Sequence, residues 1–391
     1  MYRMNEEIES MYCIKCGEKY PVGDYFSGCS KCLEKGENAA LSFRYKAAIC
    51  TKSGIKGMQR YKSALPYVTF PTLGEGNTPV VKFEEMAKFF GVKEIFIKNE
   101  FQNPTGSHKD RMSPLVVARA LELGKKGIVA ASSGNAGISI AAYAANSGLD
   151  CQIISPRNVN MTYKNAIEAA GAELVILDEA DDTAHGRWSY MRKMVVDCDW
   201  YPATNYILPP VGSNCFGVQG YKTIAYEIYE RFGARLPEYI FVPVSRGDLL
   251  WGIFEGFMEL LKLAYIGALP KLVCVEPFRR LSKVLEGEDY RNDFTGDYSL
   301  TDSIGDNTVT YQSYIAVRDS GGFAVDVSQG NVMDDVRHMA HLGLYLEASS
   351  SVVFSALKTA VEKRIPDKNC RILLIATSSG FKNRPEIFQK Y

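Results

Sequence analysis

Short apolar runs alternate with amphipathic stretches along most of this chain of 391 residues. Runs of strand length, rich in Val, Ile, Phe and Ala, occupy residues 93–100, 127–131, 151–156, 172–177, 239–244, 271–277 and 371–376. Stretches with apolar residues at helical spacing lie between them, for example from Leu115 and from Tyr221. Strands that alternate with helices in this way predict βαβ units, and therefore a parallel, doubly wound α/β sheet.

The longest apolar stretch, residues 249–268, contains Glu255, Glu259 and Lys262 at helical spacing. A membrane span of this length would exclude such charges, so the stretch predicts an amphipathic helix. Residues 1–10 are polar and acidic and resemble neither a signal peptide nor a transit peptide. We therefore expect a cytoplasmic protein with no membrane partner.

Charge and composition narrow the partners further. The 45 Lys and Arg residues balance 45 Asp and Glu residues, and the apolar content of 46% is ordinary for a globular protein. Because no excess of positive charge indicates a polyanion, we expect a small-molecule ligand and no nucleic acid, with any anion site built locally. The length predicts two or three domains.

Four of the ten cysteines form a cluster near the N-terminus: Cys13 and Cys16, then Cys29 and Cys32. Two C-x2-C pairs at this spacing supply four thiolates, the ligand set of a tetrahedral structural Zn²⁺ site. Disulfide bonds are the alternative, and the lack of a secretion signal disfavours them. Because four cysteines leave no open coordination position, we expect the zinc to be structural.

One lysine is the most informative single residue. Asn103-Pro104 and Gly106 predict a turn, and Ser107 is a candidate N-cap for the helix that follows. Lys109 would then lie in a first helical turn, where the macrodipole disfavours a protonated amine. A neutral lysine is a nucleophile toward an aldehyde; the alternative for a lysine in a turn is a solvated surface residue.

Two glycine-containing turns each join a predicted strand to a predicted helix. The first is Ser132-Ser133-Gly134-Asn135, which precedes a helix of small residues. Strand, turn and helix in this order aim several backbone N–H groups at one anion. The alternative is a plain βα turn with a serine N-cap.

The second turn, Ser245-Arg246-Gly247-Asp248, follows the strand at 239–244. Backbone N–H groups at the start of the next helix can hold a phosphate, and Arg246 could pair with it bidentately. Asp248 would repel the phosphate unless its carboxylate points away or bonds a backbone N–H.

The run N-P-T-G-S-H-K-D-R at 103–111 resembles the cofactor-lysine motif of fold-type II pyridoxal-phosphate (PLP) enzymes, most closely that of threonine synthases. His108 stands where that branch usually has Phe. The Ser132–Asn135 loop, the segment 217–228 and the turn that contains Thr377 resemble further elements of the same enzymes. The resemblance implies that Lys109 is joined covalently to the cofactor and moves a proton at the substrate α-carbon.

The resemblance also implies roles for other residues of this chain. The substrate carboxylate would be held by Ser132, Ser133, Asn135 and Ala136, with Asn135 also bonding the cofactor 3-oxygen and Gln219 near the substrate. The cofactor phosphate would be held by Ser245, Arg246, Gly247, Asp248 and Leu249. A neutral hydroxyl, Thr377 or alternatively Ser378, would face the pyridine nitrogen and suit elimination or replacement better than transamination.

The implied fold is a fold-type II α/β architecture of the tryptophan synthase β type, with two doubly wound parallel-sheet domains plus a small zinc ribbon. We expect the ribbon at residues 1–40, a large PLP-binding domain at 41–110 and 206–391, and a small substrate-binding domain at 111–205. The cofactor would lie between the last two. A homodimer is also implied.

The leading prediction is a threonine synthase-like, carbon–oxygen lyase reaction of amino-acid biosynthesis, in which O-phosphohomoserine and water give threonine and phosphate. It needs a second anion pocket, for which Arg157, Lys164 and Lys222 are candidates. One alternative is β-elimination or β-replacement on serine, threonine or an activated serine, as in dehydratases, ammonia-lyases and β-substituted alanine synthases. Another is a zinc-containing regulatory protein that keeps the fold without turnover. The turn at 245–248 would favour it, because Ser-Arg-Gly-Asp stands where the enzymes that this chain resembles often have a glycine-rich phosphate turn.

Overall fold

The computed structural model describes residues 2–46, 54–132 and 134–382, and the chain divides into two compact units. Unit 1 comprises residues 1–77 and 103–220, and unit 2 comprises residues 78–102 and 221–391. The cysteine-rich segment belongs to unit 1, and the domain boundaries expected from the sequence stay predictions. None of the described helices is long and apolar enough to cross a membrane.

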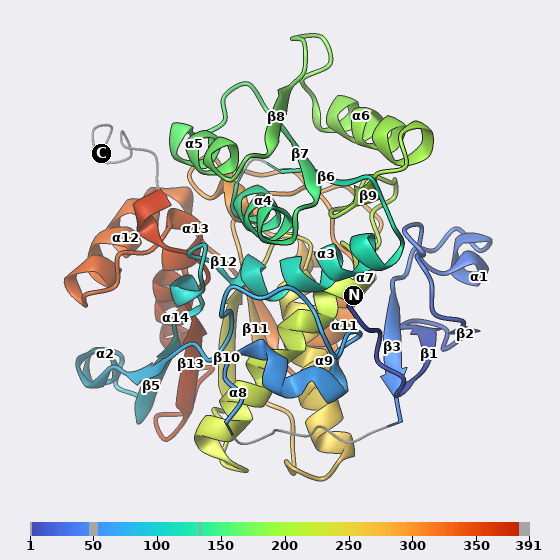
Figure 1. Cartoon of the computed structure of the whole chain (residues 1–391). Helices are drawn as coiled ribbons and strands as arrows, with labels where there is room; N and C mark the ends of the chain where they lie inside the picture. The colour runs from blue at the N-terminus through green and yellow to red at the C-terminus, as the bar shows by residue number, and fades with distance from the viewer. Residues whose placement is uncertain (1, 47–53, 133, 383–391) are drawn as a thin grey trace. The chain divides into compact units, whose positions relative to one another are not determined.

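Unit 1 contains an antiparallel and a parallel sheet (Figure 1). Its strands are β1 (Ile8–Cys13), β2 (Lys19–Tyr20), β3 (Leu41–Tyr45), β6 (Gly127–Ala131), β7 (Asp150–Ser155), β8 (Glu173–Ile176) and β9 (Tyr201–Pro202). Its helices, with η for 3₁₀, are α1 (Ser30–Leu33), η1 (Met58–Ala64), η3 (His108–Arg111), α3 (Ser113–Glu122), α4 (Asn135–Ser147), α5 (Met161–Ala169), α6 (Ala184–Asp197), α7 (Cys215–Val218) and η4 (Gln219–Tyr221). The sheet orders are β2-β1-β3 and β8-β7-β6-β9.

The parallel sheet of unit 1 places the loop 132–135 at a topological switch point. From β6 the chain passes through α4 to β7 and through α5 to β8 on one side, and then through α6 to β9 on the other. The loop at the carboxyl end of β6 therefore lies where the strand order reverses, which is where open α/β sheets bind ligands. Helix α6 covers this sheet, with Met191 packed against Val129 and Ile154.

The cysteine-rich segment is attached to the parallel-sheet part of unit 1 through Asp24. The Asp24 carboxylate accepts hydrogen bonds from Arg119 of α3, at 3.1 Å from Nε and 2.7 Å from Nη2, and from the Tyr201 hydroxyl at 2.7 Å. Arg119 is only 7% exposed and also pairs with Glu122 at 2.8 Å. Because removing one partner of a buried charge leaves that charge uncompensated, Asp24 contributes to the stability of α3.

Unit 2 contains one six-stranded sheet and the helices on its two faces. Its strands are β4 (Val80–Lys82), β5 (Glu94–Lys98), β10 (Tyr239–Pro243), β11 (Lys271–Glu276), β12 (Phe323–Asp326) and β13 (Arg371–Ile375). Its helices are α2 (Glu84–Phe90), η2 (Glu100–Gln102), α8 (Lys222–Phe232), α9 (Asp248–Lys262), α10 (Leu281–Leu285), η5 (Asp302–Ile304), α11 (Tyr311–Asp319), η6 (Gln329–Asn331), α12 (Val332–His341), α13 (Ala348–Ser351), α14 (Val353–Glu362) and η7 (Gly380–Lys382).

The order of this sheet is β12-β11-β10-β13-β5-β4, in which only the edge strand β4 runs antiparallel to its neighbour. From β10 the chain moves to β11 and β12 on one side and then returns to β13 on the other. The turns after β10 and β13, which contain Ser245 and Thr377, therefore lie side by side at the switch point. One face of the sheet packs against Phe90 of α2, Met339 of α12 and Leu357 of α14.

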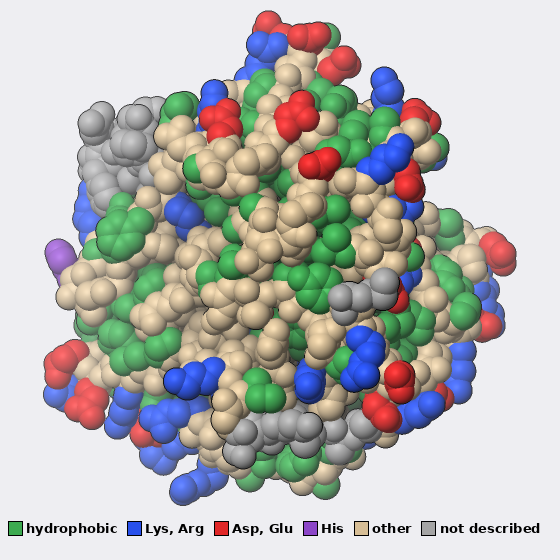
Figure 2. Space-filling model, viewed as in Figure 1, with side chains coloured by type: hydrophobic (Ala, Val, Ile, Leu, Met, Phe, Trp, Pro, Cys, Tyr) green, Lys and Arg blue, Asp and Glu red, His purple; other side chains and the backbone are tan. Residues whose placement is uncertain are grey.

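The surface mixes both signs of charge. Figure 2 shows basic and acidic side chains interspersed on the face in view. Exposed ion pairs include Lys31 with Glu18 at 2.7 Å and Lys88 with Glu85 at 2.6 Å. Exposed pairs of this kind each contribute little to the free energy of unfolding. The equal numbers of basic and acidic residues in the sequence recur as local pairs, and these pairs do not indicate a binding site.

Candidate active site and cysteine cluster

Lys109 lies in the 3₁₀ helix η3, which ends at Arg111 before α3 begins at Ser113. The first-turn position expected from the sequence is therefore a separate 3₁₀ turn and not the start of α3. The residue is half-buried, and its carbonyl oxygen accepts from the Met112 amide at 3.0 Å and the Ser113 hydroxyl at 3.2 Å. Ser107 occupies the expected N-cap position, but its hydroxyl makes no capping hydrogen bond.

The neighbouring Asp110 holds the lysine turn in place through hydrogen bonds to its carboxylate. Its carboxylate is buried and accepts hydrogen bonds from the Thr105 amide, the Thr105 hydroxyl and the Ser139 hydroxyl, each at 2.6 Å. Ser139 belongs to α4, so Asp110 connects the lysine turn to the helix that follows the loop 132–135. Neither Asp110 nor Ser139 is a sequence-predicted site residue, because only the structure shows that this carboxylate is buried and where its donors lie.

Ser132 builds the loop that was expected to hold a carboxylate. Its hydroxyl oxygen accepts from the amides of Gly134 at 3.3 Å and Gly137 at 3.0 Å, which satisfies two amides near the N-terminus of α4. The first helical amides of α4 have no intrahelical acceptor and suit a carboxylate ligand. The other predicted carboxylate ligands are Asn135, which is buried, Ala136, which is half-buried, and Ser133, which lies outside the described residues.

Gln219, the remaining substrate-side candidate of unit 1, is buried beside the antiparallel sheet. Its Nε2 donates to the Ser42 hydroxyl at 2.9 Å, and its Oε1 accepts from the Tyr45 hydroxyl at 3.2 Å. Both partners belong to β3, so these bonds give Gln219 a structural role. Its contact with substrate stays a prediction.

In unit 2 the turn 245–248 joins β10 to the 15-residue helix α9. Gly247 is the residue before the helix and has a φ of +90°, and a Cβ added there would collide with the side chain of Ser313. Only glycine fits both conditions. Ser245 is half-buried and Leu249 is buried in the first turn of α9, where the leading amides offer donors to an anion.

The two charged residues of this turn already have protein partners. Arg246 Nη2 lies 2.6 Å from Asp306 Oδ2, and Asp248 Oδ1 accepts from Gln312 Nε2 at 2.7 Å. The condition under which an aspartate is tolerated in a phosphate turn, a partner for its carboxylate elsewhere, is therefore met. A direct pairing of Arg246 with phosphate stays a prediction.

Beside this turn, Thr377 and Ser378 follow β13 and are both buried. The Thr377 amide donates to the Ser350 hydroxyl oxygen at 2.8 Å, and the Glu347 amide donates to the Ser378 carbonyl at 3.0 Å. Helix α13 and the residue before it thus hold this hydroxyl-rich turn in place. Glu347 has the structural hydrogen-bonding role that suits a buried glutamate in such a position, since its carboxylate also accepts from Ser303.

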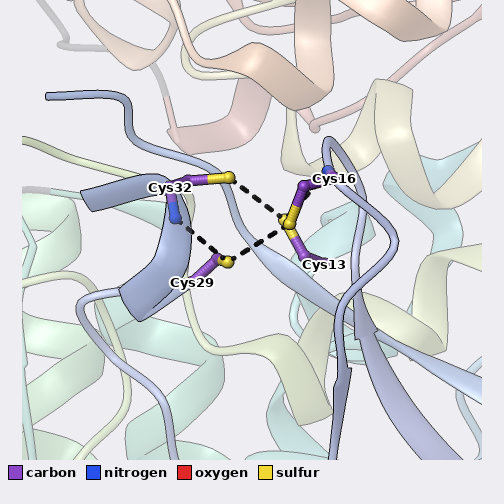
Figure 3. Close-up of side chains that lie close together, drawn as sticks. All are labelled: Cys13, Cys16, Cys29 and Cys32. Carbon is purple, nitrogen blue, oxygen red and sulfur yellow. Dashed lines mark hydrogen bonds between the residues drawn. The ribbon is translucent and has the colours of Figure 1, made fainter. Parts of the chain in front are cut away.

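The four clustered cysteines converge on one point in unit 1 (Figure 3). The sulfurs of Cys13 and Cys32 are 3.7 Å apart, those of Cys16 and Cys29 are 3.6 Å apart, and all four lie within 4.8 Å of one another. A tetrahedral Zn²⁺ with Zn–S bonds of about 2.3 Å requires sulfur separations of roughly 3.8 Å. The arrangement therefore has the size of a four-thiolate metal site.

Two of these thiols differ in acidity. Burial raises the pKa of Cys13 to about 11. Burial also acts to raise the pKa of Cys29, but hydrogen bonds from the Tyr20 hydroxyl and the Cys32 amide outweigh it and lower that pKa to about 7. Donors that favour a thiolate before any metal arrives are typical of a cluster that binds a cation.

Residues 71–378 match the protein family described as pyridoxal-phosphate dependent enzyme. The chain belongs to this family. The matched range contains Lys109, the loop 132–135, the turn 245–248 and Thr377. Membership confirms the prediction of a PLP-dependent enzyme and disfavours the regulatory alternative.

The chain is similar to threonine synthases over nearly its whole length. It is 30% identical to the threonine synthase of Methanocaldococcus jannaschii over 391 aligned residues, which cover 95% of this chain and 92% of the relative. It is 26% identical to the threonine synthase of Methanosarcina acetivorans, with 95% of this chain and 91% of the relative covered. The predicted resemblance to the threonine synthase branch is therefore confirmed.

Solved structures confirm the fold class of this PLP-dependent enzyme. A PLP-dependent aspartate racemase superposes with a TM-score of 0.64 at 20% identity, covering 79% of this chain and 92% of its own. Isoform 2 of threonine deaminase from Solanum lycopersicum superposes with a TM-score of 0.65 at 20% identity, covering 77% of this chain and 83% of its own. At this identity the likeness establishes the α/β fold shared by such enzymes.

The residues present fit the cofactor of the family. The leading amides of α9 and the glycine at 247 form a turn with the donors that a phosphate dianion needs. The Ser107 hydroxyl, two residues before Lys109, is buried and finds no hydrogen-bond partner among the described residues. Thr377 supplies the kind of neutral hydroxyl that leaves a pyridine nitrogen unprotonated.

Proposed function

We propose that this chain catalyses a threonine synthase-type reaction, in which O-phosphohomoserine and water give threonine and phosphate. The extent of the similarity supports this. Alignments with two threonine synthases cover 95% of the chain, whereas the broader family match begins at residue 71. A relationship confined to the cofactor-binding body shared by many amino-acid enzymes would not reach into the N-terminal 70 residues.

Lys109 is the proposed attachment point of the cofactor and the base of the reaction. Pyridoxal phosphate, when bound, withdraws electrons from the substrate α-carbon and so makes its proton removable. The Lys109 amine then takes that proton and returns it at a later step, which requires a fixed position and a neutral nitrogen. The bonds from Thr105 and Ser139 to Asp110 hold the turn on which the amine is carried.

The other predicted site residues lie at the two switch points of the sheets. The start of α4 would bind the substrate carboxylate with backbone amides and the predicted residues Ser132, Ser133, Asn135 and Ala136. The start of α9 would bind the cofactor phosphate with backbone amides of the turn formed by Ser245, Arg246, Gly247, Asp248 and Leu249. Thr377, with Ser378 as the alternative, would face the ring nitrogen.

We further propose that the cysteine cluster binds a structural Zn²⁺ through Cys13, Cys16, Cys29 and Cys32. The sulfur separations support four sulfur ligands, and the hydrogen-bond donors around Cys29 favour the thiolate form of that one residue. We also propose a homodimer, which the family resemblance implies, and a cytoplasmic location, which the polar and acidic N-terminal residues favour. Size-exclusion chromatography with light scattering tests the first of these.

Covalent labelling of the lysine tests the function directly. After addition of PLP and reduction with borohydride, mass spectrometry of peptides should find the cofactor on Lys109. The Lys109→Ala variant should lose the label and lose turnover of O-phosphohomoserine by at least about 10³-fold, because nucleophile and base are removed together. Lys125→Ala is the matched control, since Lys125 pairs with Asp199 at 2.5 Å elsewhere in unit 1, and it should keep both properties. Label on another lysine would contradict the assignment.

A second candidate, β-elimination or β-replacement on an unphosphorylated substrate, is favoured by the state of the predicted anion pocket. Lys222 Nζ donates to Glu259 Oε1 at 2.7 Å, and Lys164 lies 3.9 Å from Glu168. Two of the three cations nominated for the substrate phosphate thus have carboxylate partners. Release of ammonia from serine or threonine, without release of phosphate from O-phosphohomoserine, would decide for this candidate.

A further inference from the structure

We propose that Arg246 and Asp248 are positioning residues that fasten the turn 245–248 to the segment 304–313, and that this fastening, not a direct contact of Arg246 with phosphate, sets how tightly the turn holds the cofactor. The inference rests on the proposed cofactor role of the turn. It explains why charged side chains occupy a turn that in related enzymes is rich in glycine.

The side chains carry the first two attachments. Arg246 Nη2 lies 2.6 Å from Asp306 Oδ2, and the two side chains are 28% and 12% exposed. Asp248 Oδ1 accepts from Gln312 Nε2 at 2.7 Å, and Gln312 is buried. A charged hydrogen bond that is largely removed from water is stronger than an exposed one, so both contacts can hold the turn in place.

The backbone of the same positions carries two more attachments. The Thr310 hydroxyl donates to the Arg246 carbonyl at 2.5 Å. Immediately before the turn, the Val244 carbonyl accepts from Arg280 Nη2 at 2.9 Å. Positions 244, 246 and 248 are therefore each attached to residues outside the turn, and Gly247 between them packs against Ser313.

The segment that receives these contacts is itself fixed. Arg280 Nη1 donates to the Asp306 carbonyl at 2.6 Å and Arg280 Nη2 to the Ile304 carbonyl at 3.3 Å. Thr310 is buried and caps α11, which packs against α9 (Figure 1). Because the partner segment is already ordered, each contact forms without the entropy cost of ordering that segment. Each contact therefore holds the turn more strongly.

The attachments also decide what the turn offers to an anion. The charge of Arg246 is balanced by Asp306, and the Asp248 carboxylate is satisfied by an uncharged amide. Backbone N–H groups at the start of α9 and the Ser245 hydroxyl are donors that the phosphate can use. Their geometry depends on the turn, so loss of an attachment should weaken binding without removing a ligand group.

A double-mutant cycle on Arg246→Gln and Asp306→Asn tests the proposal in the full-length protein, with PLP affinity measured by titration of the bound-cofactor absorbance. Each single variant should raise the Kd for PLP on the order of 10-fold, the usual effect of losing one charged hydrogen bond. The double variant should be no worse than the singles, because both changes break the same link. Pyridoxal, which lacks the phosphate, should bind all of these variants alike.

A direct contact of Arg246 with phosphate makes the opposite prediction for one variant. Asp306→Asn would then free the guanidinium, and PLP would bind with unchanged or higher affinity. That result, or additive losses in the double variant, would overturn the proposal. Arg337→Ala, which breaks an exposed pair with Asp334 in the same unit, is the control and should leave the Kd unchanged.

Two further measurements keep the test decisive. If Arg246→Gln fails to fold, Gln312→Met, which removes the donor to Asp248 and leaves the Thr310 cap of α11 in place, should weaken PLP binding. Borohydride labelling of the wild-type protein distinguishes failure of the fastening proposal from failure of the proposed function. Label on Lys109 together with unchanged Kd values in every variant refutes the fastening alone, whereas no label on Lys109 refutes the proposed function beneath it.

Discussion

The loop 132–135 of unit 1 and the turn 245–248 of unit 2 occupy equivalent places, each at the carboxyl end of a strand beside a switch point, yet they are held differently. Ser132 accepts from the amides of Gly134 and Gly137, and its carbonyl accepts from the Ser155 hydroxyl of the adjacent strand β7, so the first loop is held by uncharged groups within residues 132–155. The second turn is held by Asp306, Thr310 and Gln312, about sixty residues further along the chain.

The difference shows how a departure from a family motif can be accommodated. The loop of unit 1 satisfies two amides near the start of α4 with the hydroxyl of its own Ser132 and needs no charged partner. A turn with Arg246 and Asp248 in place of small residues needs partners for two charges, and a distant segment supplies them. The second turn depends on residues that are distant in the sequence, and its contacts link two separate segments of unit 2.

Removal of the proposed metal should give the largest effect and should act on unit 1 alone. Chelation in the cysteine cluster should destabilise unit 1 by several kcal/mol, because structural zinc binding is folding free energy. Release of the segment that carries Asp24 would also leave Arg119 short of a partner. Hydrogen exchange followed by mass spectrometry should show lost protection in peptides from α3 and β9 and little change in β10 and β13.

The control for this experiment is Cys198→Ser, which removes a half-buried thiol outside the cluster and should leave the metal content unchanged. Cys13→Ser should reproduce the effect of the chelator. Equal loss of protection in both units after chelation would contradict the local role of the cluster.

Substitution of Gly247 should have the next largest effect and should act on the turn of unit 2. Gly247→Ala forces an alanine into a φ of +90° and against Ser313, which we expect to cost about 2–4 kcal/mol of unfolding free energy and to weaken PLP binding. Gly267→Ala is the matched control, because a Cβ at that position in unit 2 meets no atom within 4 Å. Denaturant unfolding and PLP titration measure both consequences. A Gly247→Ala protein as stable as the control would show that the turn is looser than its contacts indicate.

A smaller effect, a dependence of the free energy of unfolding on pH, is expected in unit 2. Burial raises the pKa of Asp335 on α12 to about 7, with Asp334 also raising it and Lys358 and the hydrogen bond from Ser355 acting in the opposite direction. Because the folded protein holds this proton more tightly than the unfolded chain, its contribution to stability is full at acidic pH. That contribution is lost as pH rises from 3.8, the ordinary pKa of an aspartate, through about 7.

Asp335→Asn should remove this dependence. Relative to the variant, the wild-type free energy of unfolding should fall by about 2–3 kcal/mol between about pH 5 and about pH 8. Denaturant titrations at several pH values give the comparison, and Asp319→Asn, at an exposed position elsewhere in unit 2, is the control. Parallel curves for wild type and Asp335→Asn would contradict the raised pKa.

Much of the fold could be predicted from the sequence because its strands are short apolar runs separated by clear helices. The strands at 127–131, 151–155 and 239–243 lie where the runs indicate, and the helix expected at 249–268 is α9, which begins at Asp248 and ends at Lys262. Strand β12 and helix α12 were not predicted. Strand β12 is a four-residue edge strand, and its apolar run of three residues, Phe323 to Val325, is too short to stand out in the sequence.

The main residues of the site could be predicted from the sequence, but the residues that hold them in place could not. Lys109 and the cysteine cluster stand out because their neighbours in sequence form recognisable spacings. Asp110 is beside Lys109 in the sequence, but its donor Ser139 lies on another helix, and no local pattern indicates that pair. The same holds for Arg246 with Asp306, whose contact depends on how β10, α9 and α11 pack.

The carboxylate of Asp24 constrains how this chain can change over generations. Arg119 stacks over Phe216 at 4.5 Å and relies on a segment between two pairs of cysteines for one of its counter-charges. A descendant that lost the first forty residues would inherit a poorly compensated guanidinium in its interior, and a descendant that lost the guanidinium would leave an acidic loop without its anchor. We therefore expect the two features to appear and disappear together among relatives, so that a seemingly detachable N-terminal module is inherited as part of the catalytic body.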